Sequence, residues 1–413
     1  MKQKQLLVLL IALLLISTFK LQAAEQKTVT PSPALTEYLQ QAWELHPEIQ
    51  AAQTAVLVAK ARHNAADRPV YNPEIEVELE RTDINTFSFG VSQAIDWGNK
   101  RAAATEIADA EIRLFEAELM QLRFSLSDEV LNVLVDLQAA RNLQKLAQQR
   151  VELMQEFLAN TEKRQQAGDV GTQDVALAKV ALSEAKMQLA GSKAQQAENL
   201  AKLQAASGIF SDNWPSLLQE PPKPDALQAL ETYFEKLPPL IAANARLIVA
   251  KSNIALAKAE RKADPTLGIR AGAEDTEALL GLTFSMPLNF RNTYRAEVEV
   301  ASQESLQIEQ LLMAERQRAK AHLLGAHRRY SLVYTAWQSW KLTGMTSLQQ
   351  QMDLIQTIWK AGEMSTADYL VQAKQNVDAQ ETAVELSSQM WMAWIEWLTV
   401  SGKLENWILQ AKF

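Results

Sequence analysis

The sequence contains no cysteine among its 413 residues and only 13 glycines and 13 prolines. Without cysteine the fold cannot rely on disulfides or on an acylated thiol, even in an oxidising compartment. The scarcity of helix breakers, beside abundant Ala, Leu, Gln and Glu, predicts mostly long helices. Positive charge is also scarce: the formal net charge is −8. This balance argues against a nucleic-acid partner, because phosphate binding needs a basic face.

Long apolar runs are missing except at the N-terminus. There Lys2 and Lys4 precede an apolar stretch from Leu6 to Ile16, and Leu21-Gln22-Ala23-Ala24 follows it. This arrangement predicts a secretory signal peptide over residues 1–23, too short to span a membrane, with an N-terminal membrane anchor as the alternative. Its removal takes three lysines away and the formal charge to −11. Beyond it no apolar run approaches the roughly 20 residues of a membrane helix, so any membrane contact is expected to use strands.

One motif occurs twice and organises the chain. The stretch from Ala167 to Asp174 (AGDVGTQD) returns 194 residues later, from Ala361 to Asp368 (AGEMSTAD). Each copy follows a long helical pattern and opens another, and three other matching positions recur at offsets of 191 to 194 residues. Agreement of this kind predicts a duplicated unit in which only loops have changed length.

Each repeat contains a short region with strand periodicity. Residues 73–93 and 265–286 each contain two runs in which apolar and polar side chains alternate, which predicts two β-hairpins. In the first run, Ile75, Val77 and Leu79 lie on one face and four glutamates on the other: Glu74, Glu76, Glu78 and Glu80. The four strands approach the 9 to 11 residues of a tilted membrane strand. A soluble, half-buried sheet would show the same alternation and is the alternative.

The other segments carry the three- and four-residue apolar spacing of helices. In the first repeat, residues 24–208, helices broken at Pro47 precede the hairpin, and a long helix and a return helix follow it, 99–167 and 172–207. Thr172 is the expected N-cap of the return helix. At about 1.5 Å per residue, the long helix would form a rod on the order of 100 Å.

The second repeat, residues 237–402, is expected to follow the same plan, with helices over 239–262, 293–360 and 366–401. The first of these and the return helix of the first repeat are expected to stack end to end beside the first long helix. The proline-rich segment 209–236 would then form an equatorial linker, and residues 403–413 a C-terminal tail.

Four strands cannot close a barrel, and open sheet edges are not tolerated in lipid. Closure would need further copies of the chain: two give eight strands with a filled interior, and three give twelve with room for a pore. If the apolar faces meet lipid, the four glutamates line that pore and favour cations. A solvated strand face without selectivity is the alternative.

The two Gly-to-Asp turns and the stretch Ser92-Gln93-Ala94-Ile95-Asp96, followed by Gly98 and Arg101, resemble the TolC-like outer-membrane efflux family. The last stretch is most similar to the CzcC-type heavy-metal branch. The resemblance implies a mainly α fold with a β-barrel contribution, a homotrimer with a twelve-stranded barrel and an α-helical tunnel, and a place in the outer membrane that extends into the periplasm. It also implies a periplasmic adaptor and an inner-membrane pump as partners.

In the family the tip turns are where adaptors dock and the aperture closes. By resemblance these roles fall to the following residues of this chain: Gly168, Val170, Thr172, Asp174, Gly362, Met364, Thr366 and Asp368. Two departures stand against full transfer. Leu177 and Val371 occupy positions where some relatives carry a second acidic residue, and no cysteine is present for acylation.

No motif for catalysis, phosphate binding or a cofactor is present. The four histidines are scattered (His46, His63, His322, His327), so no metal site is expected. The tryptophans and methionines are expected to pack between helices. The favoured function is the exit duct of a tripartite efflux system for heavy-metal cations. Multidrug export and type I secretion are alternatives, and a soluble periplasmic coiled-coil adaptor is the alternative of another class.

Overall fold

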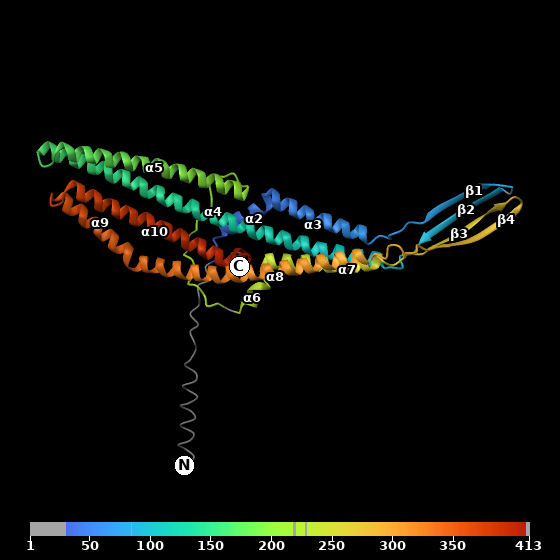
Figure 1. Ribbon diagram of the computed structural model, residues 1–413. Coiled ribbons are helices and arrows are strands. Elements are labelled where there is room, and N and C mark those ends of the chain that lie inside the picture. Colours follow the sequence, from blue (N-terminus) through green and yellow to red (C-terminus); the bar gives the residue numbers. More distant parts are fainter. Residues whose placement is uncertain (1–29, 84, 218–219, 228, 410–413) are drawn as a thin grey trace, which may run out of the picture.

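The computed structural model describes residues 30–83, 85–217, 220–227 and 229–409. The predicted signal peptide, residues 1–23, lies outside them. The described chain is long and narrow, with a four-stranded sheet at one end, two helical turns at the other, and the C-terminal region near the middle (Figure 1).

The first repeat begins with α2 (Pro33–Leu45) and α3 (Pro47–Ala66), which are separated at His46. His46 is extended because the residue before a proline is excluded from the helical region. Then follow β1 (Glu74–Arg81), β2 (Asn85–Ala94), α4 (Lys100–Ala167) and α5 (Thr172–Ser207). Helix α4 is unbroken over 68 residues, as the lack of internal glycine and proline predicts.

The second repeat contains α7 (Pro238–Glu260), β3 (Thr266–Glu274), β4 (Glu277–Ser285) and α8 (Arg295–Ser339), then the short η1 (Trp340–Gly344), α9 (Met345–Lys360) and α10 (Thr366–Val400). The short helix α6 (Leu230–Phe234) lies in the linker. The division of the chain into two structural repeats joined by an equatorial linker stays a prediction.

The expected single helix over 293–360 is wrong in one place. Residues Trp340–Gly344 form a π-helical turn, and the chain changes direction between α8 and α9 (Figure 1). The ring of Trp340 lies directly against Gly344, where any side-chain carbon would overlap it. A π turn inserts one extra residue into the helix, which redirects the segment that follows.

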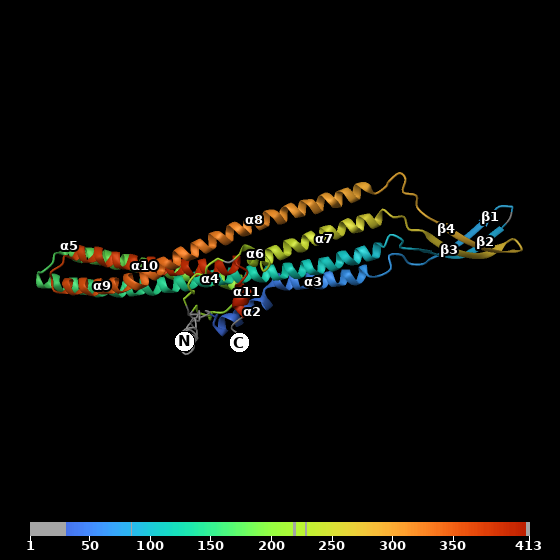
Figure 2. The same ribbon diagram turned by 90° about the horizontal axis from the view of Figure 1, so that it is seen from below.

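Helix α4 is flanked along its whole length by shorter helices. Helix α5 packs on its tip-side half, and α3 and α7 pack on its sheet-side half (Figure 2). The expected end-to-end arrangement of α5 and α7 is wrong. The end of α5 at Gly208 lies against His46 at the start of α3, and the end of α10 at Gly402 lies against Lys236, just before α7. Each return helix therefore stacks on the helix that precedes the hairpin of its own repeat.

The expectation that no later segment approaches a membrane helix is also corrected. Among the described residues, α7 is the helix long and apolar enough to cross a membrane. It instead packs between α4 and α8, with Leu240, Ala242 and Leu247 buried.

The two hairpins join into one antiparallel sheet in the order β1-β2-β3-β4. The β2–β3 pair links the repeats in a register that sets Phe89 opposite Ala271 and Gly90 opposite Arg270. Strands β1 and β4 lie at the two ends of the sheet, and the outer edge of each is unpaired in the described chain. The sheet is therefore open on both sides.

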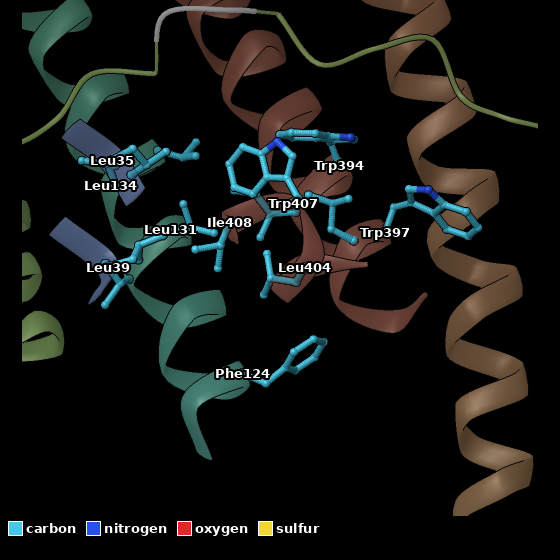
Figure 3. Packing of buried hydrophobic residues seen from close by; sticks show 14 of the residues in the cluster. Leu35, Leu39, Phe124, Leu131, Leu134, Trp394, Trp397, Leu404, Trp407 and Ile408 are labelled. Carbon is cyan, nitrogen blue, oxygen red and sulfur yellow. The ribbon is translucent and has the colours of Figure 1, made fainter. Parts of the chain in front are cut away.

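The main core lies at the waist of the molecule, where the repeats meet. Figure 3 shows side chains from α2, α4 and α10 converging with those of α11 (Leu404–Leu409). Trp394 and Trp407 meet edge to face with ring centroids 4.9 Å apart. The expectation of a plain tail over 403–413 is thus wrong for residues 404–409, because Leu404 and Ile408 are fully buried there.

Candidate functional sites

The two tip turns lie together at the end of the molecule opposite the sheet (Figure 1). Helices α4 and α9 end in left-handed glycines, Gly168 with φ of 85° and Gly362 with φ of 81°. A residue with a side chain is strained in that conformation, so glycine is needed to turn the chain sharply. The sequence motif therefore marks the turns correctly.

The helices that leave the two turns begin differently. The N-cap of α5 is Gly171, and not Thr172 as expected, because Thr172 is already the first helical residue. Asp174 accepts the Gly171 N–H at 3.0 Å through Oδ2. In the second turn, Ser365 Oγ accepts the Asp368 N–H at 3.1 Å and donates to Asp368 Oδ2 at 2.6 Å. Both aspartates thus hold a helix start in place.

The predicted tip residues differ in exposure. Gly168, Thr172, Gly362 and Asp368 are exposed, and Val170, Asp174 and Met364 are half-buried. Thr366 is buried, with an exposed fraction of 4%. Its side chain therefore faces the helix packing rather than a partner.

A buried aromatic cluster, which the sequence analysis did not find, joins the two repeats behind the turns. Phe157 of α4 stacks on Tyr369 of α10, and Trp359 of α9 packs on both, with ring centroids 4.8 to 5.0 Å apart. Burial, with a smaller effect of Glu156, raises the pKa of Tyr369 to about 12. Nearby, Lys360 pairs with Glu156 at 3.2 Å. These residues have no common sequence motif, so only the packing of the repeats reveals them.

One face of the sheet is polar, and we call it the polar sheet face. The register places these residues on it: Glu74, Glu76, Glu78, Glu80, Thr86, Ser88, Gly90, Ser92, Gly268, Arg270, Gly272, Glu274, Glu277, Gly281 and Thr283, with Leu279 as the large apolar member. The four predicted glutamates therefore do share a face. The opposite face carries large apolar side chains, and Leu280 and Leu282 are about 85% exposed.

The four glutamates are not equivalent. Glu78 Oε2 accepts a hydrogen bond from Ser88 Oγ at 3.1 Å and pairs with Arg270 Nη1 at 2.7 Å. Glu76 Oε1 accepts one from Ser92 Oγ at 2.8 Å. Glu74 and Glu80 have no side-chain partner among the described residues. Arg270 was visible in the sequence as a polar position of β3, but its pairing depends on the β2–β3 register.

Asp264 joins the sheet to the helices. Its side chain is only 5% exposed. It accepts hydrogen bonds from the Tyr71 hydroxyl at 2.5 Å, from Lys100 Nζ at 2.7 Å and from the Trp97 N–H at 3.1 Å. Burial by itself would raise the pKa of Asp264, but the bonds from Lys100, Tyr71 and the Gly98 N–H outweigh it and lower that pKa. The cluster fixes the strand bases to the start of α4.

No chemical centre is assembled elsewhere in the described residues. They contain no group of three or more His, Asp or Glu placed to hold a metal ion. Of the histidines, His63 lies 3.2 Å from Asp109, and His327 Nε2 lies 2.7 Å from the Asp225 carbonyl.

Known proteins share both this sequence pattern and this fold. Residues 38–209 match the family described as outer membrane efflux protein. The nickel-cobalt-cadmium resistance protein NccC of Alcaligenes xylosoxydans xylosoxydans is 27% identical over 302 residues, which are 68% of this chain and 66% of NccC. The chain thus spans just under two thirds of the length of NccC.

The cobalt-zinc-cadmium resistance protein CzcC of Cupriavidus metallidurans is 24% identical over 347 residues, 81% of this chain and 79% of CzcC. Among solved structures, a crystal structure of CusC has a TM-score of 0.77 at 16% identity, covering 91% of this chain and 93% of that chain. The mainly helical fold with a four-stranded sheet, expected from the sequence, is confirmed.

Proposed function

We propose that this chain, whose resemblance to the outer-membrane efflux proteins is confirmed in sequence and in fold, is the outer-membrane exit duct of a tripartite system that expels heavy-metal cations. The observation that carries the proposal is a short sheet with two open edges and two opposite faces, one polar and one apolar, at the end of very long helices. Open edges and exposed leucines are stable in lipid only when the sheet closes.

Closure is supplied by three copies of the chain. Strand β4 of one copy pairs with β1 of the next, and twelve strands enclose a pore. The apolar face then meets lipid, which accounts for exposed side chains such as Phe87, Leu280 and Phe284. The helices continue the pore as a tunnel into the periplasm, in line with the outer-membrane location in the family description.

The helical tips are the docking points for a periplasmic adaptor, which links the duct to an inner-membrane pump. Of the predicted tip residues we retain the seven that are not buried: Gly168, Val170, Thr172, Asp174, Gly362, Met364 and Asp368. In this proposal the energy for transport comes from the pump.

Two observations support metal cations as the cargo. Both curated relatives are named as resistance proteins for divalent metals, with cobalt and cadmium common to the two names. In addition, the polar sheet face carries six glutamates and one arginine on its described residues, so the pore of three copies is strongly acidic. An acidic pore lowers the barrier for cations and raises it for anions.

The proposal is tested by growth of a strain lacking this protein on graded zinc, cobalt, nickel, cadmium, copper and silver, beside dyes and antibiotics. Sensitivity to divalent metals alone, reversed by the intact gene, is the expected result. Sensitivity to dyes and antibiotics alone would move the assignment to multidrug export. Recovery of the protein in the soluble periplasmic fraction would overturn the duct and favour an adaptor.

A further inference from the structure

The polar sheet face carries one positive charge against six negative ones. Its acids are Glu74, Glu76, Glu78, Glu80, Glu274 and Glu277, and its one base within the described residues is Arg270. The other strand arginine, Arg81, follows Glu80 directly and therefore lies on the opposite face. A lone cation among so many carboxylates, placed by the sheet register, suggests a specific role.

The position of Arg270 is built by its neighbours. Arg270 on β3 pairs with Gly90 on β2 and with Gly281 on β4. A side-chain carbon at Gly281 would lie 2.8 Å from Arg270 Nε, and one at Gly90 would lie 3.2 Å from Arg270 Cβ. Gly281 thus leaves room for the arginine side chain, and Gly90 allows the close approach of the β3 backbone at Arg270. The side chain crosses β2 to reach Glu78 on β1.

The Arg270–Glu78 ion pair limits the ability of these carboxylates to bind cations. Glu78 is occupied by Arg270 at 2.7 Å and by Ser88 at 3.1 Å, while Glu76, two positions earlier on β1, binds only Ser92. Two neighbouring carboxylates in each of three copies would otherwise form a ring of oxygen ligands that holds divalent cations. Ion flow requires binding that is favourable enough to enter and weak enough to leave.

We propose that Arg270 is a selectivity-determining residue of the duct: it moderates the cation preference of the pore and prevents the Glu76 and Glu78 carboxylates from retaining divalent metal. The inference rests on the proposed function, because it requires the polar sheet face to line a closed pore. It assigns to one residue the balance between attracting metal cations and releasing them.

The test uses the full-length protein in planar lipid bilayers. The ratio of K⁺ to Cl⁻ permeability comes from the reversal potential in a KCl gradient, and block is measured with Zn²⁺ or Co²⁺ added on the sheet side. Arg270→Gln is expected to raise the permeability ratio about two- to fivefold, from three positive charges removed within a Debye length of the path. It is also expected to introduce block at lower metal concentration.

Two further variants separate charge from shape. The double variant E78Q/R270Q removes one charge of each sign and is expected to restore a ratio close to that of the unmodified protein. Arg81→Gln, on the other face, is the matched control and should change neither quantity. If Arg270→Gln behaves like Arg81→Gln, the inference is overturned.

The absence of cysteine gives a second measurement within one protein. Arg270→Cys introduces a single thiol into the chain. A positively charged thiol reagent should then lower the permeability ratio and relieve metal block, and a negatively charged one should do the opposite. No response to either reagent would also overturn the inference. Failure of the unmodified protein to form any channel would instead count against the proposed function.

Discussion

The two repeats follow the same path with different helices. Helix α4 runs from the sheet to the tip without interruption and has buried residues along most of its length. Its counterpart is divided into α8, the π turn η1 and α9, and has far fewer buried residues. Glycine is absent from the interior of α4, whereas the second long helix contains Gly325 inside α8 and Gly344 in the π turn. The first repeat therefore contains one continuous long helix, and the second contains a long helix that is interrupted at η1.

The repeats also touch each other at corresponding places. Tyr71 precedes β1 and Asp264 precedes β3, 193 positions apart, and their side chains share a hydrogen bond of 2.5 Å. Equivalent positions of the two repeats thus act as donor in one and as acceptor in the other, and this hydrogen bond joins the repeats at the base of the sheet.

The largest loss of stability is expected from a substitution in the part of α4 that is buried in the main core. Leu134 is fully buried within the main cluster, and Leu134→Ala should lower the free energy of unfolding by about 2–5 kcal/mol through lost burial and a residual cavity. Leu312→Ala in α8 is the matched variant, and its loss should fall near the lower end of that range because Leu312 lies outside that cluster. Urea unfolding of the purified protein measures both. Equal losses would contradict the conclusion that the first long helix is packed more tightly than the second.

The next effect concerns the Asp264 junction. Asp264→Asn should destabilise the protein by about 1.5–3 kcal/mol, since it weakens charge-assisted hydrogen bonds at a buried position. Its folded-state pKa lies below the ordinary value, so the stabilisation is present above about pH 4 and is lost as pH falls through the folded pKa.

Thermal melting between pH 7 and pH 2 checks the Asp264 prediction. The variant should lose less stability at low pH than the unmodified protein. Asp67→Asn serves as the control, because the Asp67–Arg101 pair is exposed and should show little change in melting temperature at neutral pH. Parallel acid curves for the Asp264 variant and the unmodified protein would contradict the assignment.

A smaller loss of stability is expected at the π turn η1. Gly344→Ala places a carbon against the Trp340 ring and should cost about 1–3 kcal/mol. Gly325→Ala, where a side chain meets nothing within 4 Å, should instead stabilise α8 by about 0.5–1 kcal/mol. The substitution at Gly344 should become milder in a Trp340→Ala background. If both alanines stabilise the protein, the Trp340 contact does not maintain the π turn.

The smallest effects distinguish the helix starts at the tips. Ser365→Ala removes a side-chain cap and should cost about 1 kcal/mol. Gly171 has an extended backbone, and a side-chain carbon there would make only ordinary contacts, so Gly171→Ser should gain a few tenths of a kcal/mol. Hydrogen exchange at the first turns of α5 and α10 reports both. Opposite signs at the two tips are the expected result.

Local features of the fold were predictable from the sequence. Proline and left-handed glycine mark helix ends, as at Pro47 and Gly168, and alternation marks strands, because both signals depend on neighbouring residues. The π turn was missed because a single glycine in a helical pattern is ordinarily tolerated. What matters is its contact with Trp340, which depends on side-chain packing.

The site was predictable only in part, since its pairings are non-local. The shared face of the four glutamates follows from the period of one strand. The pairing of Glu78 with Arg270 needs the register between strands from different repeats, and the Asp264 cluster needs the same junction. The burial of Thr366 likewise depends on how α10 packs, which the motif itself does not encode.

The β2–β3 pairing has a consequence for the order of events during synthesis. Thr86 pairs with Glu274, so the first hairpin is made long before the strand that completes its inner edge. Pairing between such distant segments is slow, and an unpaired strand edge is prone to aggregate while it waits. The inner edge of β2 is therefore open to pairing with other chains until the second repeat is present.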